Sequence, residues 1–178
     1  EELKSAHFDT IFRLSAAAEY RDKETGNHIK RVSHYSKIIA EKMGLSAEET
    51  ELIFWASPMH DIGKLGIPDA ILQKPGKLTP EERAVMEQHT VIGAMVLKDT
   101  TADVLKKSRI VALTHHEKID GTGYPLKLKG NEIPIEGKIV ALADVYDALS
   151  SRRCYKEPFS EEKVLSILKE GSGNHFDG

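Results

Sequence analysis

The residues best suited to chemistry lie in one short stretch, residues 55–64, with the sequence WASPMHDIGK. Adjacent residues on a helix diverge by about 100°, so His60 and Asp61 can face one point only if something lies between them. A metal cluster is the natural candidate, because imidazole supplies a nitrogen ligand and a carboxylate can bridge two cations. Gly63 would let the backbone turn, and Lys64 would bring positive charge to an anionic substrate. A lone His-Asp pair is more often a hydrogen-bonded couple, so other residues must decide.

Further imidazole and carboxylate side chains lie at predicted helix ends or on predicted apolar faces. They are Glu24, His28, His89, His115, His116 and Asp144. If Glu24 and His28 share a helical turn, their i, i+4 spacing places a carboxylate and an imidazole on one face. A lone histidine on an apolar face, such as His89, is usually a hydrogen-bonded core residue. The whole set, with His60 and Asp61, outweighs these single interpretations.

The ligand types restrict the metal and the reaction. The single cysteine, Cys154, excludes an internal disulfide and a thiolate-rich zinc site. Imidazole and carboxylate ligands suit iron, manganese, zinc or cobalt. A carboxylate bridging two metals about 3.5–4 Å apart suits a cluster that presents a bridging water as hydroxide and holds a phosphate oxygen for in-line attack. The implied chemistry is phosphoester hydrolysis.

Length and composition bound the setting of this site. With 178 residues, 40% of them hydrophobic, the chain can bury one sizeable core, which predicts one domain over residues 1–178. A formal net charge of −3 argues against a nucleic-acid polymer or an anionic membrane as partner. We find no membrane-spanning run and no secretory signal, so we expect a cytoplasmic location. Because the chain opens at Glu1 and stops at Gly178, we expect a fragment of a longer protein.

The elements that must position the site are predicted to be helices. Helical spacing of apolar residues, without a convincing alternating strand, predicts an all-α fold of roughly seven helices. Pro58 should kink a helix just before His60, because it removes a backbone hydrogen bond. Residues 1–20 form a leading helix that either packs on the domain or carries a signal from an upstream domain. Helix starts are predicted from capping residues at Ser46, Thr79 and Ser160.

Two segments between the predicted helices also carry candidate functional residues. Residues 118–134 form the longest irregular segment, and a loop of that length is usually functional, although a surface excursion is a fair alternative. Arg152, Arg153 and Lys156 form a local cationic cluster in an acidic chain.

Three ordered motifs resemble the signature of HD-GYP domains. They are HDIGK at residues 60–64, HHE at 115–117 and DGTGYP at 120–125. The resemblance extends over nearly the whole chain and implies a single helical domain of the HD superfamily around a buried metal cluster. It also implies metal-dependent hydrolysis of cyclic di-GMP, a bacterial second messenger, to linear pGpG and often onward to GMP.

The resemblance implies roles for individual residues. The central metal pair would be held, with Asp61 as the bridge, by His60, Asp61, His89, His115, His116 and Asp144. Glu24 and His28 would extend the cluster towards a third metal. The cofactor would be two or three divalent ions, with iron or manganese preferred over zinc, cobalt or nickel. Asp61 and Lys64 would take part in catalysis.

The resemblance also places substrate contacts. Lys64, Arg153 and Lys156 match positions associated with substrate phosphates. Gly121 to Pro125 should form the rim of the site, where Tyr124 either lies against a guanine or only fixes the loop. The implied partners are a cyclic dinucleotide substrate, an upstream receiver or sensor domain, a second copy in a homodimer, and diguanylate cyclase domains.

Other functions remain open at this point. The same chemistry fits 3',3'-cyclic GMP-AMP, because purine discrimination would rest on a few hydrogen bonds at the pocket edge. A catalytically silent metal-binding interaction module is disfavoured by the intact set of ligand residues. A nucleotidase or alarmone hydrolase of the wider HD superfamily would share His60 and Asp61 but would lack the glycine-tyrosine-proline loop, which is present here.

Overall fold

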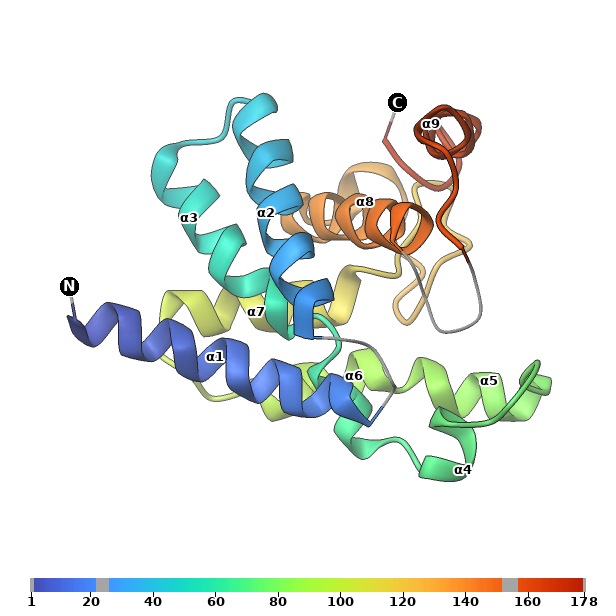
Figure 1. Cartoon of the computed structure of the whole chain (residues 1–178), viewed down its shortest axis with the longest axis horizontal. Coiled ribbons are helices and arrows are strands. Elements are labelled where there is room, and N and C mark those ends of the chain that lie inside the picture. The colour runs from blue at the N-terminus through green and yellow to red at the C-terminus, as the bar shows by residue number, and fades with distance from the viewer. Residues whose placement is uncertain (1, 22–25, 152–156, 178) are drawn as a thin grey trace.

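The computed structural model describes residues 2–21, 26–151 and 157–177, and in these ranges the chain is all-α, as predicted (Figure 1). The described ranges contain no strand, and their isolated bridge joins Ser172 and Phe176. With η for a 3-10 helix, the elements are α1 (Glu2–Tyr20), α2 (Gly26–Lys42), α3 (Ala47–Ala56), η1 (Ser57–Met59), η2 (Ile62–Gly66), α4 (Asp69–Leu72), α5 (Pro80–Glu87), α6 (His89–Val96), α7 (Asp103–Thr114), η3 (Gly130–Glu132), α8 (Ile135–Ser150) and α9 (Glu161–Glu170).

The helical region after Thr79 contains a break that affects the site. The helical region that begins after the predicted cap Thr79 is divided into α5 and α6 at Gln88. The backbone N–H of Gln88 donates to the carbonyl of Val85, three residues earlier, so the turn is tightened into 3-10 geometry. The division places His89 at the start of α6.

Three apolar clusters in the described part of the chain hold the helices together, and two of them involve the helices around the site. One cluster joins α2, α3, α7 and α8 through Val32, Ala56, Val111, Val140 and Ala143. The other joins α1 to the segment after α3 and to α7 through Ile11, Ala18, Met59, Ile62, Leu97 and Ala112. Figure 1 shows α1 running beneath α2 and α3. The second cluster therefore fixes α1 directly against the segment that carries His60 and Asp61.

The end of α1 is also held by hydrogen bonds. The guanidinium of Arg21 donates to the carbonyls of Leu65 at 2.8 Å and Ile67 at 3.0 Å, and forms an ion pair with Asp69 at 2.6 Å. Near the other end of α1, the ring of Phe8 stacks on the ring of Trp55 in α3. These contacts bracket α1 between α3 and η2.

The interruption predicted at Pro58 is confirmed. Helix α3 ends at Ala56, and Pro58 lies in the 3-10 turn η1, where its missing N–H removes no required bond. His60 follows this turn immediately, and η2 begins at Ile62. The chain therefore changes direction twice within a few residues, which carries His60 and Asp61 into the interior.

The predicted helix starts are confirmed as well. Ser46 and Thr79 form capping boxes, and the Ser160 hydroxyl accepts from the backbone N–H of Lys163. These caps satisfy backbone donors that a helix start would otherwise leave free. None of the helices in the described part of the chain is long and apolar enough to cross a membrane.

Candidate metal centre

Two groups of buried donor side chains lie in the interior. The first, called the Asp61 group, consists of Asp61, His89, His115 and His116. The second, called the Glu19 group, consists of Glu19, His28 and His60. Within each group, every residue offers one ligand atom within 4.8 Å of the others. The residues come from α1, α2, α6 and the segments that follow α3 and α7, which are distant in sequence.

Asp61 connects the two groups. Its Oδ1 lies 3.2 Å from Nε2 of His89 and 3.5 Å from Nε2 of His115. Its Oδ2 lies 3.4 Å from Nε2 of His60. Because its two oxygens face different groups, Asp61 occupies the position of a bridging carboxylate.

The tautomers of the ligand histidines are fixed by backbone carbonyls. Each Nδ1–H donates to a carbonyl one turn earlier: His60 to Ser57 at 2.9 Å, His89 to Met86 at 2.7 Å, and His115 to Val111 at 3.0 Å. A carbonyl can only accept, so Nδ1 carries a proton and, in the neutral ring that binds a metal, Nε2 keeps its lone pair. All three lone pairs are therefore available to a metal around Asp61.

The burial and spacing of these ligand atoms suit coordination of a metal ion better than hydrogen bonds between the side chains. Among the buried side-chain atoms that make no hydrogen bond in the described part of the chain are Nε2 of His60, His89 and His115, and Oδ1 of Asp61. Buried polar atoms without a partner are costly. Two donors each about 2.1 Å from one ion are about 3.0 Å apart at a right angle and about 4.2 Å when opposite. The 3.2–3.5 Å separations around Asp61 fall in this range.

Lys64 keeps Asp61 ionised. Its Nζ lies 2.8 Å from Oδ2 of Asp61. Burial alone would raise the pKa of Asp61, but its charged and hydrogen-bonding partners, Lys64 first among them, outweigh it and hold that pKa well below its usual range. The carboxylate is therefore in the form that binds a cation.

His116 is suited to be a neutral ligand. Burial, followed by the neighbouring His115, lowers the pKa of His116 well below its usual value. The ring of Tyr124 stacks on the ring of His116 with centroids 4.8 Å apart. Burial and then the charge of Asp61 raise the pKa of Tyr124, so its hydroxyl stays protonated. Tyr124 thus forms a wall of the centre with a hydrogen-bond donor at its tip.

Glu117 anchors the loop that carries Tyr124. The Glu117 carboxylate is buried and accepts from the backbone N–H of Leu126 at 2.7 Å and of Leu128 at 3.0 Å. The backbone N–H of Tyr124 donates to the carbonyl of His116 at 3.2 Å. The third residue of the HHE motif therefore holds the loop and does not point at the donor groups.

Glycines set the close approach of the segments around the centre. A Cβ on Gly63 would lie 1.8 Å from the carbonyl oxygen of His89 and 2.4 Å from the backbone nitrogen of Gly93. A Cβ on Gly123 would lie 2.4 Å from the backbone nitrogen of Lys118. The first contact fixes the separation of Asp61 from His89, and the second folds the loop onto the end of α7.

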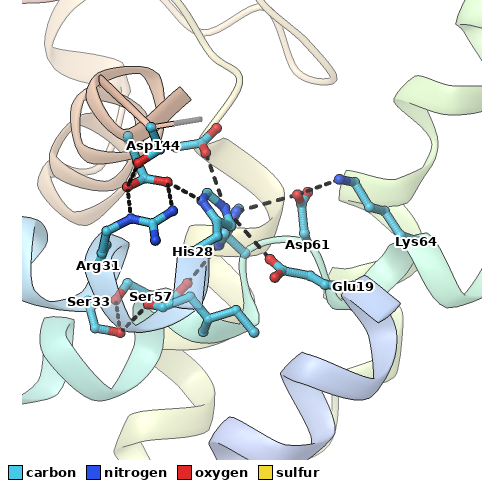
Figure 2. A network of polar contacts seen from close by, with 12 residues as sticks. Glu19, His28, Arg31, Ser33, Ser57, Asp61, Lys64 and Asp144 are labelled. Atoms are coloured by element: carbon cyan, nitrogen blue, oxygen red, sulfur yellow. Dashed lines mark hydrogen bonds and ion pairs between the residues drawn. The ribbon is translucent and has the colours of Figure 1, made fainter. Parts of the chain in front are cut away.

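Side chains, not carbonyls, orient His28. Its Nδ1 lies 2.7 Å from Oδ2 of Asp147, which also binds the guanidinium of Arg31 at 2.5 and 3.0 Å. Burial opposes ionisation of Asp147, but these two partners outweigh it and lower its pKa to about 2. Nε2 of His28 lies 3.5 Å from Oδ1 of Asp144 and 3.7 Å from Oε1 of Glu19 (Figure 2). A carboxylate on Nδ1 is the usual outer partner of a metal-binding histidine.

The structure thus brings together most of the predicted ligands. Asp144 lies beside His28, and Gly121, Tyr124 and Pro125 lie in the anchored loop. Glu24, Arg153 and Lys156 lie outside the described residues, so their roles stay predictions.

Glu19, Arg31 and Asp147 were not predicted as site residues. Ile11, Ser15 and Glu19 follow one another at intervals of four residues along α1, and all three are buried. A carboxylate at this spacing on the buried face of a helix was the feature of the sequence that could have indicated Glu19 as a site residue.

The chain matches the family model described as "HD domain" over residues 13–178. It is 49% identical to a "Cyclic di-GMP phosphodiesterase" of Vibrio cholerae serotype O1, covering 99% of this chain and 38% of that protein. It is 42% identical to a "3'3'-cGAMP-specific phosphodiesterase 2" of the same organism, covering 99% of this chain and 34% of that protein. The chain therefore spans well under half the length of these relatives.

A solved structure shares the arrangement of helices. It is described as a cyclic GMP-AMP specific phosphodiesterase of V. cholerae and superposes with a TM-score of 0.70, covering 96% of this chain and 45% of that chain. The sequences are 19% identical, so this likeness concerns the fold alone.

Proposed function

Because the chain belongs to the HD domain family and, within it, to the HD-GYP group, we propose that it hydrolyses cyclic di-GMP to linear pGpG or to GMP. One observation carries the proposal. The two carboxylate oxygens of Asp61 face imidazole nitrogens of two donor groups, while Lys64 binds the same carboxylate. This arrangement suits a bridged metal pair beside an anionic substrate.

The residues of this chain would hold and orient the reactants. Divalent ions bound by the two donor groups would act as Lewis acids and lower the pKa of a bound water. Asp61 stays ionised and fixes the relation of the two groups. Lys64 places a positive charge at the entrance to Asp61, where a phosphate oxygen would be attracted. Tyr124 offers a protonated hydroxyl and shields His116 from solvent.

The identity and the number of the bound metal ions are also part of this proposal. The donor set is compatible with divalent metals generally, and we propose iron or manganese, with zinc, cobalt or nickel as alternatives. Two metals would be bound by the residues around Asp61 and His28. The predicted third metal was assigned to Glu24 and His28.

The substrate contacts are proposed as the sequence suggested. Lys64, Arg153 and Lys156 would bind phosphates. Gly121, Tyr124 and Pro125 would border the dinucleotide, with Tyr124 against a guanine. Support comes from the anchoring of this loop by Glu117 next to His116.

A second candidate substrate is 3',3'-cyclic GMP-AMP. The relative named for that substrate is 42% identical over 99% of this chain, which is close to the identity with the relative named for cyclic di-GMP. Discrimination between the two would depend on the few groups that meet one purine. Both dinucleotides must therefore be tested side by side.

The remaining parts of the proposal concern the setting. We propose one HD-GYP domain over residues 1–178, with residues 1–20 leading into it, in a cytoplasmic protein. An upstream receiver or sensor domain, a homodimer and contact with diguanylate cyclase domains are proposed from the resemblance. The short share of each relative that this chain covers supports the presence of other segments in such proteins.

The test is turnover of cyclic di-GMP by protein prepared without oxygen and with measured metal content, with products separated by chromatography. Turnover that disappears in Asp61→Ala supports the phosphodiesterase and identifies the product. Turnover of cyclic GMP-AMP alone would transfer the proposal to that substrate. No turnover of either by protein with at least two bound metals would overturn it in favour of an interaction module.

A further inference from the structure

A buried carboxylate at the end of α1 has no place in the predicted ligand set. Glu19 is 1% exposed, and its Oε1 lies 3.7 Å from Nε2 of His28. In Figure 2 its side chain reaches from α1 towards His28, on the side away from Arg31. Its ligand atom lies within 4.8 Å of those of both His28 and His60.

The spacing in this group is that of ligands around an ion. The 3.7 Å from Glu19 to His28 exceeds the usual hydrogen-bond range of about 2.7–3.2 Å. It falls within the range of about 3.0–4.2 Å expected for two donors of one metal ion. Oδ1 of Asp144, 3.5 Å from the same nitrogen, falls within it too. Two imidazoles and the Glu19 carboxylate therefore surround one point beside the Asp61 group, and the Asp144 carboxylate lies next to the His28 ring of this set.

The orientation of His28 supports the same interpretation. Asp147 binds Nδ1 of His28 and is itself held by Arg31, so the ring cannot rotate without breaking its contact with this carboxylate. The nitrogen that faces Glu19 is therefore Nε2. The Nδ1–H of His60 donates to a backbone carbonyl, so its Nε2 also carries a lone pair.

The position of Glu19 is built into the packing of α1. Ala18, its neighbour, is fully buried in the cluster that contains Met59 and Ile62. Two residues further on, Arg21 binds the carbonyls of Leu65 and Ile67. The helix cannot move Glu19 away from His28 without disturbing the segment that carries Asp61.

We propose that Glu19 is a metal ligand, which with His28, His60 and Asp144 binds a divalent cation next to the Asp61 group. The inference deepens the proposed function and rests on its metal cluster. On this proposal, the end of α1 contributes a ligand to the metal centre. The earlier prediction gave the carboxylate of this position to Glu24.

Metal binding to Glu19→Gln tests the proposal, with Glu24→Gln as the matched variant and Ser15→Ala as a control one turn earlier on the same buried face. Each protein is loaded with Mn²⁺ without oxygen, and the metal per chain and the affinity of each equivalent are measured. We expect Glu19→Gln to bind one equivalent of Mn²⁺ at least tenfold more weakly and the other equivalents with unchanged affinity. We expect Ser15→Ala to bind every equivalent as the natural sequence does.

A second measurement holds even if Glu19→Gln fails to fold. In a crystal of the Mn²⁺-loaded natural sequence, anomalous scattering should place an ion about 2.0–2.2 Å from a carboxylate oxygen of Glu19. Unchanged binding in folded Glu19→Gln, or no ion within about 3.5 Å of Glu19, overturns the inference. Neither readout uses a dinucleotide, so an enzyme inactive on cyclic di-GMP would refute the proposed function and leave this inference standing.

Discussion

The Asp61 group and the Glu19 group present similar ligands but are held in different ways. In the Asp61 group, His89 and His115 are fixed by the backbone carbonyls of Met86 and Val111, and Gly63 brings η2 against α6. In the Glu19 group, His28 is fixed by the side chains of Asp147 and Arg31. The first group depends on backbone geometry, whereas in the second the backbone fixes His60 and side chains of α2 and α8 fix His28. The second should therefore be easier to change without unfolding the protein.

The most severe test removes the residue that the two groups share. Asp61→Asn keeps the volume but removes the charge that faces His60, His89 and His115. We expect turnover to fall by at least about 10²–10³-fold and metal to be lost from both groups. Rates and metal content at saturating Mn²⁺ would check this. Loss of metal from one group alone would show that Asp61 does not connect the two groups.

A second variant attacks the backbone contact of the Asp61 group. Gly63→Ala places a Cβ 1.8 Å from the carbonyl oxygen of His89, so η2 and α6 must separate. We expect the free energy of unfolding to fall by about 1–3 kcal/mol or more, measured by denaturant titration of the metal-free protein. Gly66→Ala is the matched control, because its new Cβ would meet only the Ile92 side chain, which can move. Equal losses in both variants would contradict the importance of this contact.

A third variant loosens only the Glu19 group. Asp147→Asn removes the charge that orients His28 and binds Arg31, so we expect about tenfold weaker binding of one metal equivalent. Titration with Mn²⁺ would resolve the equivalents. Arg31→Lys keeps a positive charge but loses the paired geometry, and its effect should be smaller. If every equivalent weakened to the same extent, the two groups would not be separable.

The smallest effect concerns the loop beside the centre. Glu117→Gln leaves one of the two backbone N–H groups of Leu126 and Leu128 without a good acceptor. We expect a loss of about 1 kcal/mol in the free energy of unfolding and a higher KM for the dinucleotide, with unchanged metal content. Glu132→Gln is the control, because that exposed carboxylate also accepts from a loop N–H, of Lys129. A change in metal content in Glu117→Gln would mean that the loop belongs to the metal centre.

Local features of the fold could be predicted because their causes are local. The capping boxes at Ser46 and Thr79 and the interruption at Pro58 depend on residues within one turn. The division between α5 and α6 could not be predicted, because a run of good helix formers conceals the tightened turn at Gln88. Tertiary contacts of α6 with η2 decide it.

The site shows the same division between local and distant causes. His60, Asp61, His115 and His116 are adjacent pairs that stand out in the sequence. Glu19 belongs to the centre only because α1 packs against η1 and η2, and a helical pattern alone cannot show which helix it meets. The function of Glu117 as an anchor depends on where the chain returns at Leu126, which spacing does not reveal.

The bonds of Arg21 have a mechanical consequence. An α-helix of this length is a stiff rod of about 28 Å, held at one end by Phe8 on Trp55 and at the other by Arg21 on η2. A push or twist at the far end of α1 is not absorbed by a flexible joint before Arg21. Such a movement would displace the carbonyls of η2 that Arg21 binds, which lie next to Lys64 in the chain. Because Lys64 binds Asp61 and α1 carries Glu19, a force applied outside the centre would change the positions of these carboxylates.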